Sequence, residues 1–188
     1  GKGTRMKSSL PKVLHVVGGK PMLRHVMDVA QGAGASRSIV VVGFGGEQVA
    51  AAMGDEAEYV TQAEQLGTGH AVLQTKEILR GFEGTVLLLC GDTPLLTVAT
   101  LHSLCEAHQS SGAAATVLTA ILANPAGYGR ILRDADGGVT GIVEQKDATP
   151  EQMEIGEINT GNYCFEAAAL FGALDGLTCN NAQKEYYL

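Results

Sequence analysis

The feature that most constrains the fold is a repeated switch between the residue period of strands and that of helices. Apolar, β-branched runs typical of buried strands lie at 38–43, 58–62, 85–90 and 115–122. They alternate with segments of helical spacing at 21–31, 46–53, 69–80 and 98–108. Such alternation over short connections predicts an α/β fold with a mostly parallel central sheet.

The pattern changes after residue 123. Two strand-like runs, 130–133 and 139–144, flank the turn residues Asp136, Gly137 and Gly138, which indicates a hairpin. A further strand is expected at 159–165 and a helix at 166–174. We therefore expect one domain over 1–188 with two parts, an α/β part at 1–123 and a smaller antiparallel lobe at 124–188.

Composition excludes several classes of protein. Apolar residues make up 45% and charged residues 18%, which is typical of a globular chain. No apolar run approaches the roughly 20 residues that a membrane helix needs. The net charge of -7 argues against a nucleic-acid partner. The 4 cysteines lack metal-ligand spacing, and we interpret them as small core residues in a reducing compartment.

The basic residues are unevenly distributed. Residues 1–27 hold six of the cations and no acid, which indicates a small anionic ligand, although a solvated basic face is the simpler alternative. Within this part, glycines let the backbone approach a phosphate, Arg5 offers a forked donor and Lys12 a point charge. The backbone that would form this loop belongs to Gly1, Lys2, Gly3 and Thr4. The alternative is a tight turn with exposed cations.

A glycine-rich loop of this kind normally follows a strand that delivers it to the ligand. The sequence begins within the loop and stops at an apolar run. We therefore expect a fragment truncated at both ends, with an apolar strand just upstream.

Two further motifs lie at strand-to-helix connections. Residues 62–70 combine amide, hydroxyl and glycine groups that can read the edge of a planar base, or form an ordinary loop with Thr68 as a helix cap. Asp92 follows a buried strand directly, at the edge of the sheet where α/β proteins bind ligands. It suits Mg²⁺ beside a nucleotide, or caps the next helix.

Seven motifs occur in a fixed order: GKGTRM…LPK, QAEQLGTGHA, GDTPLL, GYGRI, GIVEQKDA, EINTG and NNAQKEYYL. With these motifs the whole chain resembles the uridylyltransferase domain of the bacterial bifunctional N-acetylglucosamine-1-phosphate uridylyltransferase/glucosamine-1-phosphate acetyltransferase family. The first motif marks sugar-nucleotide pyrophosphorylases in general, and the later ones are more specific. The resemblance implies a Rossmann-like nucleotidyltransferase fold, in which residues 1–123 bind mainly the nucleotide and the antiparallel lobe at 124–188 binds mainly the sugar.

The resemblance also implies a reaction: UTP and N-acetylglucosamine 1-phosphate give UDP-N-acetylglucosamine and pyrophosphate, with Mg²⁺. The loop from Gly1 to Arg5 would hold the UTP phosphates, and Arg5 and Lys12 would offset charge at the reacting phosphates. The remaining roles are implied for the following residues: uracil contacts for Gln62, Gly67 and Thr68, the metal for Asp92, and the sugar for Gly129, Glu144 and Asn159.

Two positions depart from the family pattern. Cys90 stands where an aromatic residue is common, and Lys184 where glycine is frequent. A second metal ligand and the acetyltransferase half, which trimerises the family, would lie beyond Leu188. We therefore expect this fragment alone to be a monomer with little or no activity. The family's place in cell-wall synthesis implies the bacterial cytoplasm.

Two other readings stay open. The first is a related enzyme that uses glucose 1-phosphate or another hexose phosphate, against which the segments 127–130 and 157–160 argue. The second is a non-catalytic sugar-nucleotide binder that keeps the fold. Retention of Arg5, Lys12 and Asp92 argues against the binder, since binding alone would not need all three.

Overall fold

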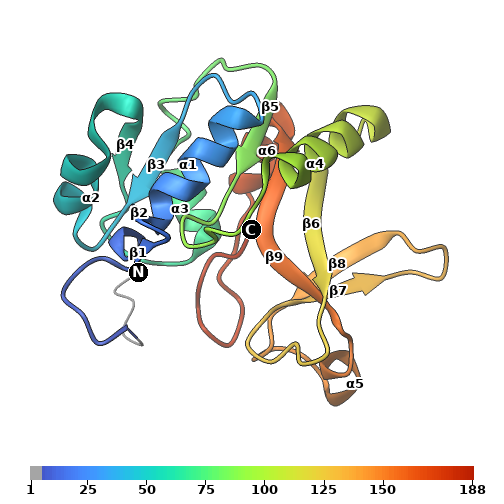
Figure 1. The fold of residues 1–188 in the computed structure, drawn as a ribbon. Coiled ribbons are helices and arrows are strands. Elements are labelled where there is room, and N and C mark those ends of the chain that lie inside the picture. Colours follow the sequence, from blue (N-terminus) through green and yellow to red (C-terminus); the bar gives the residue numbers. More distant parts are fainter. Residues whose placement is uncertain (1–5) are drawn as a thin grey trace.

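The computed structural model describes residues 6–188 and consists of helices packed on strands (Figure 1). The bounds of its helices are as follows: α1 Met22–Gly32, α2 Gly46–Met53, α3 Thr68–Leu73, α4 Val98–Ser111, α5 Pro150–Met153 and α6 Ala167–Leu174, with short 3₁₀ turns η2 Lys12–Leu14 and η3 Gly54–Glu56. The bounds of its strands are β1 Val16–Val17, β2 Lys20–Pro21, β3 Ile39–Val42, β4 Glu58–Thr61, β5 Thr85–Leu88, β6 Ala115–Ile121, β7 Arg130–Arg133, β8 Val139–Val143 and β9 Glu157–Glu166. No helix of the described residues is long and apolar enough to cross a membrane.

The predicted α/β class, the β7–β8 hairpin and the antiparallel lobe are confirmed. The parallel pairing is narrower than we expected: within residues 6–188, only β3 and β4 pair in parallel. The larger sheet is antiparallel because β9, a ten-residue strand, runs back between β6 on one edge and β5 and β7 on the other. Since β9 pairs with strands from both sides of residue 123, it joins the two expected parts of the domain. The boundary at 123 stays a prediction.

The helix expected over 69–80 is also shorter than expected, because α3 ends at Leu73. After it, Thr75 and Lys76 donate their amides three residues back instead of four. The Thr75 hydroxyl donates a hydrogen bond to the Val72 carbonyl at 2.7 Å, and such a bond competes with the backbone hydrogen bonds of the helix. Residues 74–80 therefore form turns.

The core that carries the amino-terminal part lies between α1, α2, β3 and η2. Its buried members are all apolar: Leu14, Leu23, Met27, Val42, Val49 and Met53. A second cluster, formed by Val72, Leu170 and Leu174, packs α3 against α6. Figure 1 shows the β7–β8 hairpin and α5 projecting away from both cores.

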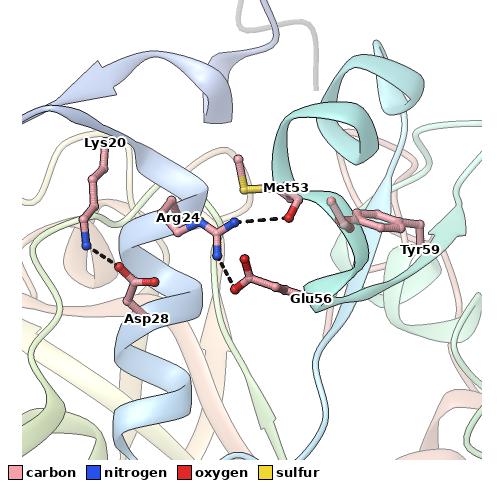
Figure 2. A network of polar contacts seen from close by, with 7 residues as sticks. Lys20, Arg24, Asp28, Met53, Glu56 and Tyr59 are labelled. Carbon is pink, nitrogen blue, oxygen red and sulfur yellow. Dashed lines mark hydrogen bonds and ion pairs between the residues drawn. The ribbon is translucent and has the colours of Figure 1, made fainter.

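Polar contacts fasten α1 to the end of α2 (Figure 2). Arg24 donates to Glu56 at 2.5 Å and to the carbonyl of Met53 at 3.1 Å. The hydrogen bond to Glu56 raises the pKa of Arg24. Lys20 of β2 forms an ion pair with Asp28 of α1 at 2.6 Å. Lys20 and Arg24, two cations of the basic region 1–27, are thus paired with neighbouring carboxylates.

Candidate active site

Lys12, predicted to act at the reacting phosphates, and Asp92, predicted to bind the metal, lie in contact at the carboxyl end of β5. Lys12 comes from η2 and Asp92 from the loop that follows the strand, 80 residues later. The Lys12 ammonium forms an ion pair with the Asp92 carboxylate, and both side chains are partly exposed, at 42% and 35%. The fold therefore places one positive and one negative group where solvent and a ligand can reach them.

The donor set around Asp92 fits magnesium better than a tightly enclosed metal. Among residues 6–188, no three His, Cys, Asp or Glu side chains gather closely enough to hold a metal ion. Mg²⁺ commonly keeps several waters and binds one or two carboxylates together with substrate phosphates. A single accessible carboxylate beside a lysine meets that requirement.

Cys90 lies two residues before Asp92 and is anchored to β9. Its amide donates to the side-chain oxygen of Asn162 at 3.0 Å, and its Sγ lies 3.3 Å from the carbonyl oxygen of Gly161. Burial, with a contribution from Asp92, raises the pKa of the thiol to about 11. Cys90 is thus a protonated packing residue at neutral pH, which matches the interpretation of the cysteines as core residues.

The residues predicted to contact the base converge on the start of α3. Gln62 is 8% exposed, and its side-chain amide donates to the carbonyl of Gly67 at 3.1 Å. Gly67 precedes Thr68 with φ at 108°, a conformation that favours glycine. The N-cap of α3 is Gly67 and Thr68 is the first residue of the helix, so the interpretation of Thr68 as the cap is wrong. We call residues 66–69 the base loop; its contact with uracil stays a prediction.

The structure also brings the three predicted sugar residues together, in one row across three strands. Arg130 pairs with Val143 of β8 and with Ile158 of β9. The next row is therefore Glu144, Gly129 and Asn159, and the Asn159 amide donates to the Gly129 carbonyl at 2.9 Å. Residues of one row share a face of the sheet.

Gly129 leaves room in the middle of this row. A Cβ at Gly129 would lie 2.7 Å from a carboxylate oxygen of Glu144, closer than real Cβ contacts allow. Only glycine therefore lets the Glu144 carboxylate lie over the neighbouring strand. The row contains the Glu144 carboxylate, an acceptor, and the Asn159 side chain, whose oxygen also accepts from the Gly161 amide at 2.9 Å. Carboxylate and amide groups can hydrogen-bond to sugar hydroxyl and N-acetyl groups.

The electrostatic surroundings of Glu144 are unfavourable to its charge. Burial raises its pKa, the negative charges of Asp147 and Glu185 add to the rise, and Arg130 opposes it. An ionisable group with a shifted pKa in a candidate site is typical of functional positions. Sequence reasoning assigned no role to Arg130, although it lies inside the GYGRI motif.

Arg130 is 2% exposed, and it donates to the carbonyl of Tyr128. No partner for its buried Nε lies among residues 6–188. The sequence signal for Arg130 is an arginine that follows the pattern Gly-Tyr-Gly at the start of a strand. It holds the turn before Gly129 from the opposite face of the sheet.

The predicted phosphate loop itself, Gly1, Lys2, Gly3, Thr4 and Arg5, lies outside the described residues. Its assignment therefore stays a prediction. The ring nitrogens of His70, beside Gln62, contact the side-chain amides of Gln62 and Gln74 at 3.0 and 3.2 Å.

Comparisons with known proteins bear on the whole chain. A model of the MobA-like NTP transferase domain matches residues 1–144. The bifunctional protein GlmU of Heliobacterium modesticaldum is 58% identical over 188 residues, which is 100% of this chain and 41% of that protein. Proteins of the same name from Geobacillus thermodenitrificans and Enterococcus faecalis are 55% and 52% identical over the same shares. The chain therefore spans about two fifths of the length of these relatives.

A solved structure shares the fold. UDP-glucose pyrophosphorylase in complex with UDP-glucose superposes with a TM-score of 0.78 at 18% identity, covering 100% of this chain and 80% of that one. The apo form of a UDP-glucose pyrophosphorylase gives a TM-score of 0.73 at 18% identity, over 99% and 80%. These similarities confirm the predicted nucleotidyltransferase fold.

Proposed function

Because the chain belongs to the family of MobA-like NTP transferase domains, we propose that it transfers a uridylyl group from UTP to N-acetylglucosamine 1-phosphate. The products are UDP-N-acetylglucosamine and pyrophosphate. The observation that supports the sugar part most directly is the row of Glu144, Gly129 and Asn159. The whole-chain identity to proteins named GlmU supports the same reaction.

The chemistry needs positioning and charge compensation. An oxygen of the sugar phosphate attacks the α-phosphorus of UTP, a new P–O bond forms, and the bond to the β-phosphate oxygen breaks as pyrophosphate leaves. The attacking oxygen is already anionic, so no general base is required. Repulsion between two anionic phosphates is the main obstacle, and cations that offset it lower the barrier.

Lys12 is the described cation best placed for that task. Its ion pair with Asp92 holds the ammonium at the carboxyl end of β5. On nucleotide binding the ammonium turns to the phosphates. Asp92 is the residue that would hold Mg²⁺, and the ion would further neutralise phosphate charge. Arg5 acts at the same phosphates.

Glu144 and Asn159 select the sugar. The Glu144 carboxylate accepts a hydrogen bond from a sugar hydroxyl, and the Asn159 amide pairs with polar groups of the sugar. A site that pairs buried polar groups with a substrate rejects analogues that leave those groups unpaired. We assign the product to cell-wall precursor synthesis and the protein to the bacterial cytoplasm, with trimerisation through a further domain of the longer protein.

Pyrophosphate release from UTP and N-acetylglucosamine 1-phosphate, with and without Mg²⁺, tests the proposal. The assay uses the chain extended at both ends, and we expect the 188-residue chain alone to release little or none. Lys12→Ala should lower kcat by at least about tenfold, the scale of one lost charge interaction at the reacting phosphates. Lys76→Ala is the matched control, because it also removes a lysine from an ion pair, with Asp175.

The competing readings predict different results. Equal turnover of glucose 1-phosphate and N-acetylglucosamine 1-phosphate would support the related enzyme that uses another hexose phosphate. Tight UDP-N-acetylglucosamine binding without pyrophosphate release from the extended chain would support the non-catalytic binder.

A further inference from the structure

A short segment near the carboxyl end, residues 181–187, has a defined conformation. The Asn181 side-chain oxygen accepts from the amides of Gln183 and Glu185 at 3.2 and 3.1 Å, and its amide donates to the Glu185 carbonyl at 2.5 Å. Lys184 adopts a positive φ of 53° within this turn. One side chain thus closes the segment on itself, and we call residues 181–187 the strap.

One end of the strap lies on the base loop. The Tyr186 amide donates to the Leu66 carbonyl at 2.7 Å, and the Gly69 amide donates to the Tyr186 carbonyl at 2.8 Å. The position of a Cβ at Gly67 lies 2.5 Å from the carbonyl oxygen of Tyr186. The backbone of the base loop is therefore packed on the backbone of the strap.

The other end of the strap is tied to the sugar lobe. The Ala182 amide donates to the Asp147 carboxylate at 2.8 Å, and the Lys146 ammonium donates to the Gln183 side-chain oxygen at 2.7 Å. The Asp147 amide in turn donates to the carbonyl of Glu144, at 2.9 Å. A hydrogen bond to a carboxylate is stronger than one between neutral groups, so Asp147 is the main tie.

We propose that Asp147 is a positioning residue for the uracil nucleotide, which it affects at a distance by holding the strap against the base loop. The proposal rests on the proposed function, because it assumes that the base loop binds uracil. Asp147 lies 80 residues from Gly67 in sequence and in the sugar lobe, so a purely local role would alter sugar recognition alone. The strap gives it a second effect, on the nucleotide.

Calorimetric titration of the chain extended at both ends, as in the pyrophosphate assay, with UDP and with UDP-N-acetylglucosamine separates the two effects. Asp147→Ala should weaken UDP binding about tenfold, the scale of one lost hydrogen bond to a charged group. Asp147→Asn keeps an acceptor for the Ala182 amide and should restore most of the affinity. Asp136→Ala, an acid of the exposed β7–β8 turn, is the matched control and should leave UDP binding unchanged.

Amide hydrogen exchange gives a readout that needs no ligand. In Asp147→Ala the amides of Gly69 and Tyr186 should exchange faster, because each donates across the contact between strap and base loop. Asp136→Ala should leave both rates unchanged.

The outcomes distinguish the two proposals. If the wild-type chain binds neither ligand while exchange at Gly69 responds to Asp147→Ala, the proposed function fails and the strap contact stands as a structural tie only. If the wild type binds UDP but Asp147→Ala changes neither UDP affinity nor exchange at Gly69, the role of Asp147 is overturned alone. A loss confined to UDP-N-acetylglucosamine would also overturn it, since it would show a local effect on the sugar.

Discussion

Replacing Gly67 with alanine perturbs the tightest contact in the candidate site. The new Cβ would lie 2.5 Å from the Tyr186 carbonyl oxygen and 2.8 Å from its amide nitrogen. Both are backbone atoms, which cannot move aside as the end of a flexible side chain can. Gly67 also has φ at 108°, where an alanine is strained. Two costs therefore add at one position.

The magnitudes follow from these two terms. Strained backbone of this kind costs about 1–3 kcal/mol. Forcing an extra carbon into a packed contact costs about 1–3 kcal/mol more. We expect Gly67→Ala to lower the free energy of unfolding by about 4 kcal/mol, near the middle of the summed range, and to weaken UDP binding because Tyr186 must move away from the base loop.

Urea unfolding, with Gly34→Ala as the matched control, measures this effect. Gly34 also has a positive φ, of 95°, but a Cβ there meets nothing within 4 Å, so its variant reports backbone strain alone. We expect the control to lose about 1–2 kcal/mol and to keep UDP affinity. Equal losses in the two variants would refute the reasoning, because the contact with Tyr186 would then contribute nothing.

Three further changes have expected outcomes. Burial raises the pKa of Glu144 in the folded state, so its ionised form destabilises the fold above that pKa. Glu144→Gln should therefore raise the free energy of unfolding at neutral pH and lose that advantage as the pH falls to about 4. The same variant should weaken sugar binding. Hydrogen bonds from Arg133 lower the pKa of Glu157 to about 2, so this carboxylate stabilises the fold above its usual pKa and stops doing so as the pH falls towards 2. Arg133→Met should therefore lower the free energy of unfolding slightly at neutral pH and flatten the acid unfolding curve; an unchanged curve would count against the pair. Lys184→Gly should raise the free energy of unfolding by about 0.5–1 kcal/mol, because φ at 53° suits glycine, and a lower melting temperature would contradict this.

Much of the fold was predictable because it depends on local residue patterns. The helices at 21–31, 46–53 and 98–108 begin within a residue of the predicted positions, since proline, glycine and apolar spacing act over one or two turns. The β7–β8 hairpin followed from its turn residues in the same way. The misjudged extent of α3 came from a competing local bond of Thr75, which spacing alone does not reveal.

The candidate site was predictable in its residue types but not in its geometry. The family motifs named Lys12, Asp92 and Glu144, yet no motif indicates that Lys12 and Asp92 form an ion pair. The strap belongs to a motif that we had quoted, and its contact with the base loop had no sequence signal. Its bonds join backbone groups more than 100 residues apart.

The residue pattern indicated most of the helices and strands, although not the extent of α3, because residue period, turn residues and caps act between near neighbours. Only the tertiary structure decided that Glu144, Gly129 and Asn159 form one row, because strand register depends on how β7, β8 and β9 pack together. The packing also sets β9 antiparallel between β5 and β6, so the larger sheet is antiparallel where a mostly parallel one was expected. Pairing across long loops is set by the burial of the whole sheet, and no short stretch of sequence encodes it.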